Sequence, residues 1–435
     1  MDRIRLRDRL NTSSSSSSNG NSLVLPKLPI NPMMNDDDVD QIITNNSKMK
    51  YHFKEKYQIK CHLSAGAHGI ILWGMDRHHS NDKSSNEIST ESPPINKCSK
   101  YDYYNDFHEI QNARHYAIKR IFIRNGIISV KLIREIKSLQ FLKGHPNVIE
   151  IIDVCASGST VNLVFPLLPT NLTTLIYGPK VNRVSPDSSL LTSELCIRFY
   201  FRMLLNGLDH LHQNGIIHRD LKPSNILIDW NGRLKLADFG QARSIDFCGE
   251  NSDQEFSNDV CTRWYRAPEL LWGSTHYGYE VDLWSSGCIL AEMIQKYPLF
   301  RGETDIEQLS LIVRSLGNPE SGEWTKNLPD FNKIQFVQVD SFDKVTETGL
   351  PGWLENFSEK TGIESSDSRL ALDLMSKLIR YGERWTTNAL LRHEYFHSQN
   401  QEQDFEEKFL IKPKFIEHLS GPPPDIKNDQ FDHYY

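Results

Sequence analysis

The chain lacks the features that mark membrane, secreted and nucleic-acid-binding proteins. No apolar run in its sequence approaches the roughly 20 residues that a helix needs to cross a bilayer. The N-terminal sequence MDRIRLRDRLNTSSSSSSNG is charged and then rich in serine, without the apolar segment of a secretory signal. A formal net charge of −7 over 435 residues provides no basic field for a polyanion. We therefore expect no membrane and no nucleic acid among the partners of this protein.

Cysteine pairs with the spacing of metal or redox sites are also missing. The seven cysteines are scattered, no two of them have C-x-x-C spacing, and an odd number does not form a disulfide framework. We expect free thiols in a reducing compartment. We expect a cytoplasmic or nuclear location, or both. The sequence does not decide between them, since no cluster of Lys and Arg marks a nuclear signal.

Three polar segments are poor in the apolar residues that a core requires, and they divide the chain. Residues 1–54 contain a serine run and the acidic stretch DDDVD, which predicts a disordered N-terminal extension. Residues 77–112 are rich in Ser and Asn and indicate a long surface insertion between two strands. Residues 399–435 are polar and Pro-rich and predict a loose C-terminal tail. One folded domain, residues 55–398, remains.

The folded domain begins with strand patterns and continues with helix patterns. YQIKCHL, GIILWGM, HYAIKRIFI and VNLVFPLL are short apolar runs typical of strands. VKLIREIKSLQFL has helical spacing, and so do three later segments: LLTSELCIRFYFRMLLNGLDHLHQNG, with a cap at Thr192 or Ser193, YEVDLWSSGCILAEMI and DIEQLSLIVRSLG. This order predicts an α+β fold of two lobes, the first β-rich and the second mostly helical.

The octapeptide HRDLKPSN, from His218 to Asn225, carries the strongest chemical signal. An Asp that accepts a hydroxyl proton and an Asn that holds a metal must lie one short loop apart to face the same phosphate, and Asp220 and Asn225 have that offset. Lys222 between them can neutralise charge on a transferring phosphoryl group. Alone, Asp and Asn in a loop are usually turn residues.

Three further residues complete the pattern. Asp238 begins DFG at the end of the strand pattern RLKLA, where its carboxylate would be a hard oxygen ligand for Mg²⁺ on the β- and γ-phosphates. Lys119 lies on a predicted strand and Glu135 on the helix after it, and an ion pair between them would direct Lys119 to the α- and β-phosphates. Each charge alone is ordinary, but the order Lys strand, Glu helix, HRD, DFG favours catalysis.

These motifs resemble those of the protein kinases over roughly residues 57 to 398. WYRAPELL, DLWSSGCILAEM, PLFRGETDIEQL and SLGNP are similar to the cyclin-dependent-kinase-like branch. TRWYRAPELLWG, LPDFNKIQF and ALLRHEYF look most like cyclin-dependent-kinase-activating kinases, of the fungal single-subunit type. The resemblance implies a bilobal kinase fold that binds ATP and Mg²⁺ between an N-lobe (55–165), a hinge (166–172) and a C-lobe (173–398).

The resemblance also implies a nucleotide site. The family's glycine loop begins with Gly where this chain has Ser64, whereas Gly66 and Gly69 keep the close approach of backbone N–H groups to phosphate. Phe165 corresponds to the back wall of the site, and the hinge would bind adenine through the Pro166 carbonyl and the Leu168 amide and carbonyl. The implied nucleotide-binding residues are Ser64, Gly66, Gly69, Ile71, Ala117, Lys119, Phe165, Pro166, Leu168, Leu227 and Asp238, with Asn225 and Asp238 as metal ligands.

Further positions match specificity and supporting residues of the family. Lys222 and Thr262 are at the positions that mark Ser/Thr rather than Tyr specificity. Asp282 corresponds to the helix Asp that holds the backbone of the HRD motif. Arg384 corresponds to the late Arg that pairs with Glu269 of APE.

The resemblance implies an activation device as well. Arg134, Arg219 and Arg243 match three arginines that bind a phosphothreonine of the activation segment, whose position here is Ser257. Carboxylates surround that serine, and two interpretations stay open: one carboxylate occupies the arginine cluster without a phosphate, or Ser257 is phosphorylated. The carboxylates are Glu250, Asp253, Glu255 and Asp259.

We expect a protein kinase that phosphorylates the activation-segment threonine of cyclin-dependent kinases and acts as a monomer. Only the Ile-Arg-Glu end of the family's PSTAIRE cyclin-docking helix is retained in residues 129–135, which argues against the first alternative, a cyclin-bound kinase of the same branch. The second alternative is a catalytically inactive scaffold with the kinase fold, and turnover of ATP would discriminate it from the others.

Overall fold

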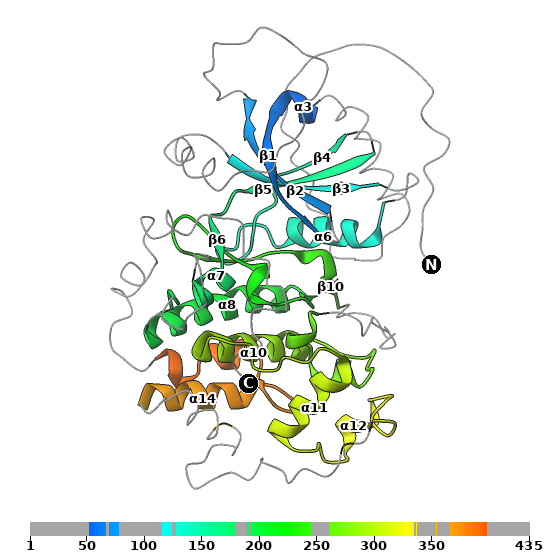
Figure 1. Ribbon diagram of the computed structural model, residues 1–435, viewed down its shortest axis with the longest axis vertical. Helices are drawn as coiled ribbons and strands as arrows, with labels where there is room; N and C mark the ends of the chain where they lie inside the picture. Colours follow the sequence, from blue (N-terminus) through cyan, green and yellow to red (C-terminus); the bar gives the residue numbers. More distant parts are fainter. Residues whose placement is uncertain are drawn as a thin grey trace. The chain divides into compact units, whose positions relative to one another are not determined.

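The computed structural model of the chain describes residues 52–66, 69–77, 115–123, 128–157, 159–178, 189–191, 193–245, 261–334, 336, 354 and 366–397 (Figure 1). They form two compact units. The first holds the described residues up to Ile133 and those from Ile151 to Pro166, and the second holds Arg134–Glu150 and the described residues from Leu167 onward. The β-rich first unit and the helical second unit confirm the predicted α+β fold class.

The first unit is built on a five-stranded antiparallel sheet in the order β1-β2-β3-β5-β4. Strands β2 and β3 are neighbours in the sheet although the segment 77–112 separates them in sequence, as expected for an insertion between two strands. Apart from Arg77, that insertion lies outside the described residues. The strands are β1 (Tyr57–Gly66), β2 (Gly69–Asp76), β3 (His115–Phe122), β4 (Asp153–Ser157) and β5 (Thr160–Pro166).

A short helix, α3 (His52–Lys56), precedes the sheet and packs on it. Phe53 of α3 is 3% exposed and joins the core formed by Tyr57, Leu72, Tyr116, Ile118, Cys155 and Val164. Asp153 of β4 fastens the helix, since it accepts from Lys56 Nζ at 2.7 Å and from the Tyr57 hydroxyl at 3.0 Å. The helix includes the last residues of the predicted N-terminal extension, because Phe53 has apolar surface to bury.

Of the five cysteines in the described residues, four follow the sequence expectation. Cys155, Cys196, Cys261 and Cys288 are free and buried. Cys61 is disulfide-bonded, so the expectation of free thiols throughout is wrong at this position. Spacing in the sequence gave no sign of that bond.

The second unit is organised around two long helices. Ser193 caps α8 (Glu194–Gln213) by accepting from Cys196 N at 3.2 Å, which confirms one of the two predicted caps. α8 packs against α10 (Glu280–Gln295), whose residues from Val281 to Met293 are all buried. No helix in the described residues is long and apolar enough to span a membrane. The other helices are α6 (Val130–Phe141), which begins in the first unit, α7 (Leu172–Tyr177), α9 (Pro268–Leu271), α11 (Asp305–Leu316), α12 (Glu323–Lys326), α14 (Ser366–Leu378) and α15 (Thr387–Leu391).

Short strands in the second unit place the chemical motifs. β8 pairs with β9 through a tight turn, so the residues at the outer ends of the two strands, Asn225 and Ala237, are adjacent, and the Ala237 amide donates to the Asn225 carbonyl at 3.0 Å. Asp238 follows directly. The strands are β6 (Thr170–Asn171), β7 (Ile216–Ile217), β8 (Ile226–Ile228), β9 (Leu234–Leu236) and β10 (Arg243–Ser244), and β7 pairs with β10.

Candidate active site

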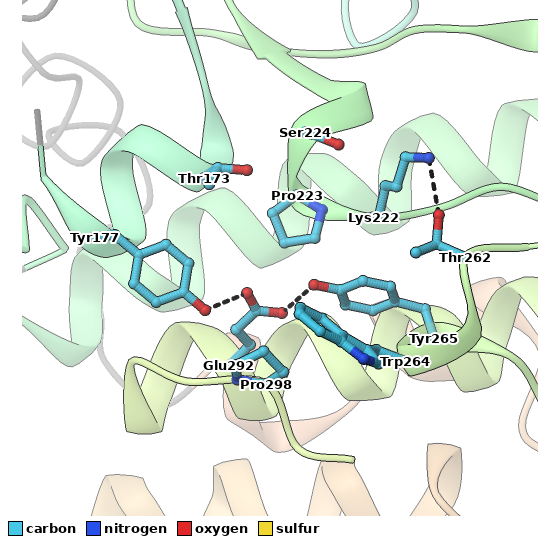
Figure 2. Close-up of a pocket in the computed structure, with 10 residues that line it drawn as sticks. All are labelled: Thr173, Tyr177, Lys222, Pro223, Ser224, Thr262, Trp264, Tyr265, Glu292 and Pro298. Carbon is cyan, nitrogen blue, oxygen red and sulfur yellow. Dashed lines mark hydrogen bonds between the residues drawn. The ribbon is translucent and has the colours of Figure 1, made fainter. Parts of the chain in front are cut away.

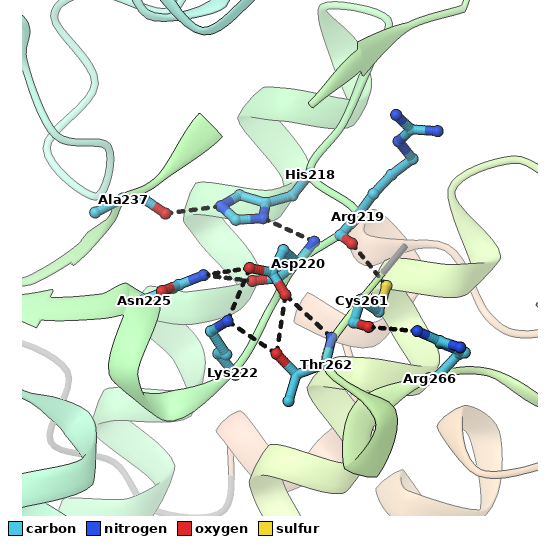
Figure 3. Close-up of polar contacts among 9 residues, drawn as sticks. All are labelled: His218, Arg219, Asp220, Lys222, Asn225, Ala237, Cys261, Thr262 and Arg266. Carbon is cyan, nitrogen blue, oxygen red and sulfur yellow. Dashed lines mark hydrogen bonds and ion pairs between the residues drawn. The ribbon is translucent and has the colours of Figure 1, made fainter. Parts of the chain in front are cut away.

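The carboxylate of Asp220 is the centre of a polar network in the second unit (Figure 3). Its Oδ2 accepts from Lys222 Nζ and from Asn225 Nδ2, each at 2.9 Å. Its Oδ1 accepts from the backbone N and the hydroxyl of Thr262, each at 3.1 Å, and Lys222 Nζ also donates to that hydroxyl at 2.8 Å. The structure therefore brings together four residues that the sequence singled out, and both oxygens of the carboxylate are fixed.

Asp282 of α10 binds the backbone of the loop that carries Asp220. Its two carboxylate oxygens accept from the amides of His218 at 2.8 Å and Arg219 at 2.9 Å, and His212 Nε2 lies 3.0 Å from Oδ2. Burial alone would raise the pKa of Asp282, but the hydrogen bond and charge of His212 and the backbone donors outweigh it, and the pKa lies below its ordinary value. A buried ionised Asp282 thus presets the loop that carries Asp220, as the sequence implied.

The predicted pair of Arg384 and Glu269 is a buried ion pair in the second unit. Arg384 Nη1 and Nη2 donate to the two oxygens of Glu269 at 2.6 and 3.1 Å. Both side chains are almost inaccessible. The bidentate geometry ties α9 to the loop after α14, which anchors the end of the activation segment.

Asn225 and Asp238 form a set of donors suitable for a divalent metal with phosphate ligands. Asn225 donates to Asp220 through its side-chain nitrogen Nδ2, so the side-chain oxygen of Asn225 can bind a cation. Asp238 has a left-handed backbone at φ 61°. Gly240 lies beside the carboxylates of Asp238 and Glu135, since a Cβ atom added to it would be 3.4 Å from Asp238 Oδ1 and 3.7 Å from Glu135 Oε2. Within the described residues no group of three or more His, Cys, Asp and Glu side chains could hold a metal by itself. The amide oxygen of Asn225 and the carboxylate of Asp238 are hard oxygen ligands of the kind that Mg²⁺ takes together with substrate phosphates.

The strand register of the first unit aligns five of the eleven implied nucleotide-binding residues. Ser64, Ile71, Lys119 and Leu163 are direct cross-strand partners in turn, across β1, β2, β3 and β5. Ala117, two residues before Lys119, is paired with Phe165. Because cross-strand partners and alternate residues share a face, Ser64, Ile71, Ala117, Lys119 and Phe165 lie on one face of the sheet. The opposite face carries the core under α3.

The turn between β1 and β2 requires glycine at one position. Gly66 is the cross-strand partner of Gly69, where the hairpin closes. Gly69 has φ 129°, and a Cβ there would lie 2.3 Å from the carbonyl oxygen of Arg120. Only glycine fits at this position, because any side chain would collide with the backbone of β3.

The structure gives the positions of other predicted residues but does not test their roles. Leu227 is in the middle of β8, opposite Lys235. Pro166 ends β5, and the neighbouring Leu167 carbonyl accepts from Trp230 Nε1 at 2.8 Å. The ion pair between Lys119 and Glu135, and adenine binding by Pro166 and Leu168, stay predictions.

The structure describes the surroundings of the predicted phosphate-binding arginines, but the residues predicted to bind them lie outside its described part. Arg219 donates from Nε to the Gln241 carbonyl at 2.8 Å and from Nη1 to the Tyr277 hydroxyl at 2.9 Å. Arg219 and Arg243 both act on Tyr277: burial raises the pKa of its hydroxyl and the two guanidinium charges lower it in part. Arg134 lies in α6. Ser257 and the carboxylates around it lie outside the described residues, so both interpretations of activation stay predictions.

Two features of the site had no counterpart in the sequence analysis. The thiol of Cys261 donates to the Arg219 carbonyl. Glu292 of α10 accepts from the hydroxyls of Tyr177 and Tyr265 at 2.6 and 2.7 Å, beside a cavity (Figure 2). Tyr265 and Glu292 are both in motifs that carried the resemblance, WYRAPELL and GCILAEM, but nothing in their spacing indicated a contact.

Comparison with known proteins identifies the family of the chain. The protein kinase domain family matches residues 105–396. Cyclin-dependent kinase D-1 of Arabidopsis thaliana is 37% identical over 297 residues, which are 67% of this chain and 66% of that protein. The serine/threonine-protein kinase KIN28 of Saccharomyces cerevisiae is 36% identical over 291 residues, 65% of this chain and 85% of that protein.

A solved structure adds the fold. The CAK complex of Chaetomium thermophilum bound to ATP-γ-S contains a chain with 29% identity and a TM-score of 0.60, covering 83% of this chain and 97% of that one. The chain belongs to the protein kinase family, as a Ser/Thr protein kinase of the cyclin-dependent-kinase-like branch.

Proposed function

We propose that this kinase transfers the γ-phosphoryl group of ATP to the activation-segment threonine of a cyclin-dependent kinase, with Mg²⁺ as its metal. The observation that carries catalysis is the Asp220 carboxylate, held on both oxygens by Lys222, Asn225 and Thr262. Similarity to the CAK complex and to the D-type cyclin-dependent kinase supports the choice of substrate. Such a substrate would place the enzyme in the cytoplasm or the nucleus.

The proposed reaction uses Asp220 as the base. The substrate hydroxyl oxygen attacks the γ-phosphorus of ATP, its proton goes to Asp220, and the bond to the β–γ bridging oxygen breaks to leave ADP. Because the carboxylate is oriented before substrate arrives, little reorganisation is needed at the transition state. The Lys222 ammonium, 2.9 Å from Asp220, would offset the negative charge on the transferring group.

We assign metal and nucleotide binding to the residues that the sequence predicts for them. Asn225 and Asp238 would hold Mg²⁺, which when bound neutralises charge on the β- and γ-phosphates. Lys119, oriented by Glu135, would bind the α- and β-phosphates. The face of the first-unit sheet that carries Ser64, Ile71, Ala117 and Phe165 would cover the nucleotide.

A cyclin-bound kinase of the same branch is the second candidate. One observation favours it, since the similar solved chain belongs to a complex. Against it, the stretch that aligns with the cyclin-docking helix retains only Ile133, Arg134 and Glu135 of the family sequence. We therefore propose a monomer. The intact Asp220 network argues against an inactive scaffold.

Phosphorylation of a purified, unphosphorylated cyclin-dependent kinase tests the substrate. The full chain, produced in bacteria, is incubated with ATP, Mg²⁺ and that kinase, with and without a cyclin, and the phosphorylated residue is identified by mass spectrometry. A matched substrate carries Ala in place of the activation-segment threonine. We expect transfer to that threonine without cyclin, and none to the Ala substrate.

Other outcomes have separate meanings. Transfer only when cyclin is present would establish the second candidate. Activity on other Ser/Thr substrates with none on this threonine would refute the proposed substrate and leave the kinase assignment intact. ATP binding without any transfer, in either condition, would support the scaffold.

A further inference from the structure

A side chain that the sequence analysis did not single out contacts the backbone of the predicted hinge. Trp230 Nε1 donates to the carbonyl oxygen of Leu167, 63 residues earlier in the chain, at 2.8 Å. Both residues belong to the second unit, in which Leu167 is 5% exposed and Trp230 is partly buried. Leu167 directly precedes Leu168, whose amide and carbonyl are predicted to bind adenine. The indole of Trp230 therefore acts on the neighbour of a predicted binding group.

Backbone pairing holds both the donor and the acceptor of this bond in place. Strand β6, which follows the hinge residues, pairs with β8, the strand that leads to Trp230. The turn after β8 is closed by Asp229, whose Oδ1 accepts from the amides of Asn231 at 2.9 Å and Arg233 at 2.8 Å. Gly232 completes the turn with a left-handed φ of 79°. Trp230 is thus carried by a hydrogen-bonded hairpin that is itself attached to the end of the hinge.

The geometry of the peptide bond converts this contact into an orientation of the next amide. The described residues contain no cis peptide bond, so the peptide unit between Leu167 and Leu168 is planar and trans. In such a unit the carbonyl and the N–H lie in one plane and point in opposite directions. Since the Leu167 carbonyl points to the indole of Trp230, the Leu168 N–H points away from it. The indole thereby fixes the direction of the Leu168 donor.

The Leu168 amide is available to a ligand. Among the hydrogen bonds of the described residues, none is donated by this amide, and Leu168 is partly exposed. Pro166 and Pro169 on either side have a fixed φ and no N–H. Rotation of the backbone in this segment is therefore concentrated in the peptide units between the two prolines. Without the bond from Trp230, the peptide unit that carries the Leu168 N–H would be free to turn.

We propose that Trp230 is a positioning residue for ATP, which orients the Leu168 amide to donate to N1 of adenine. N1 is the hydrogen-bond acceptor beside the amino group of adenine, and a donor that is oriented in advance binds it without the cost of ordering the peptide. The proposal rests on the proposed use of ATP and on the predicted adenine site at Leu168. It is independent of which protein is phosphorylated.

Calorimetric titration with two nucleotides tests this role without any protein substrate. 1-Deaza-ATP has a C–H group in place of N1, so it cannot accept from the Leu168 amide but otherwise has the shape of ATP. The full chain, at pH 8 with Mg²⁺, should bind ATP about tenfold more tightly than 1-deaza-ATP, which is the upper range for one hydrogen bond. The ratio of the two Kd values isolates the bond to N1 from the other contacts of the nucleotide.

Two substitutions of Trp230 separate its N–H group from its bulk. Trp230→Phe keeps an aromatic ring and removes the donor, and the ratio should fall to about twofold because the peptide must then be ordered on binding. Trp230→His keeps a five-membered ring with a nitrogen at the position of the indole Nε1, and should retain a ratio of about fivefold or more. A role in packing alone would make Trp230→His the more damaging variant, since Phe is closer to Trp in volume.

Asn231→Ala and Trp385→Phe are the matched controls. Asn231 is the exposed neighbour of Trp230 in the same turn, and Trp385 is an exposed tryptophan elsewhere in the second unit. Both variants should keep the ratio of the wild type. The proposal is overturned if Trp230→Phe also keeps that ratio, or if Trp230→Phe and Trp230→His lose it equally, and either result leaves the proposed function intact. A wild type that binds no ATP would contradict the proposed function and this proposal together.

Discussion

The thiol of Cys261 donates a hydrogen bond to the carbonyl oxygen of Arg219 at 2.7 Å, and both residues have a left-handed backbone at φ 64°. Non-glycine residues adopt this conformation only where the surrounding structure requires it. The contact joins the activation segment to the catalytic loop, and the residues that follow, Thr262 and Asp220, are themselves hydrogen-bonded. Arg266 Nη2 holds the Cys261 carbonyl at 3.0 Å.

We predict that the Cys261 thiol positions Asp220, so its loss lowers kcat more than it changes KM. Cys261→Ala should reduce kcat about tenfold, because small misplacements of a catalytic group are costly. Cys261→Ser keeps a donor and should retain most of the rate. Cys261→Gly removes the thiol donor and also relieves the strain of the left-handed backbone. Its kcat should equal that of Cys261→Ala.

Steady-state kinetics with one peptide substrate provides the measurement. Cys288→Ala is the control, since Cys288 is a free, buried cysteine in α10 without a contact to the catalytic loop among the hydrogen bonds of the described residues. A purely structural role would give Cys261→Ser and Cys261→Ala the same kcat, and that result would refute the prediction.

Asp282 provides a second test of positioning. Asp282→Asn leaves one oxygen for the two backbone amides of His218 and Arg219, so one buried donor loses its partner. We expect a decrease in kcat of about 10- to 100-fold and a loss of about 1–3 kcal/mol in the free energy of unfolding. Asp330→Asn, at a partly exposed ion pair with Lys333, should change neither kinetics nor denaturant melts. Unchanged kcat in Asp282→Asn would contradict the account.

The buried carboxyl of Glu292 predicts a pH dependence of stability. Burial raises its pKa from 4.5 to about 7, and the bonds from Tyr177 and Tyr265 offset this only in part. Since the folded state holds the proton more tightly, the contribution is complete below pH 4.5 and is lost as the pH rises through about 7. The expected loss is roughly 3 kcal/mol in the free energy of unfolding.

Denaturant melts of the wild type and Glu292→Gln between pH 4.5 and 8 isolate this effect, because Gln does not titrate. The wild type should lose stability relative to the variant as the pH rises. Other groups act in both proteins and cancel; among them is His145, whose pKa burial and the neighbouring His210 lower to about 4 and which destabilises the fold on acidification. Parallel curves for the two proteins would show that Glu292 has no raised pKa.

The pair of Arg384 and Glu269 should be among the most costly to break. Both side chains are almost fully buried and joined by two hydrogen bonds. Arg384→Met leaves the Glu269 carboxylate buried without its cation, and we expect a loss of about 3–5 kcal/mol in the free energy of unfolding. Arg263→Ala breaks the exposed pair with Asp305 and should cost about 1 kcal/mol or less. Equal losses in the two variants would contradict this assignment.

The sequence was sufficient for residues whose function depends on local spacing. Asp220, Lys222 and Asn225 lie in one loop, so their order in the chain determines their mutual contacts. The predicted strands contain Ile71, Ala117, Lys119 and Phe165 at alternate positions, but the pairing register that aligns them, and the irregularity of β1 that places Ser64 opposite Ile71, are seen only in the structure.

Contacts between distant segments could not be predicted in the same way. Cys261 contacts Arg219, which is 42 residues earlier, and both have left-handed backbones that no residue type indicates at either position. Tyr177 and Glu292 are ordinary helix residues in α7 and α10 until tertiary packing places them 2.6 Å apart. Likewise, α3 is stabilised by the burial of Phe53 against β-strands far along the chain.

The measurement that tests the central claim most directly compares the wild type with Asp220→Asn. Both are incubated with ATP, Mg²⁺ and an unphosphorylated cyclin-dependent kinase, and the rate of phosphate incorporation into its activation-segment threonine is followed, while nucleotide binding is monitored separately. Loss of the base should lower the rate by about 10²–10⁴-fold with nucleotide binding retained. Equal rates in the two proteins would show that Asp220 is not the catalytic base and would contradict the account.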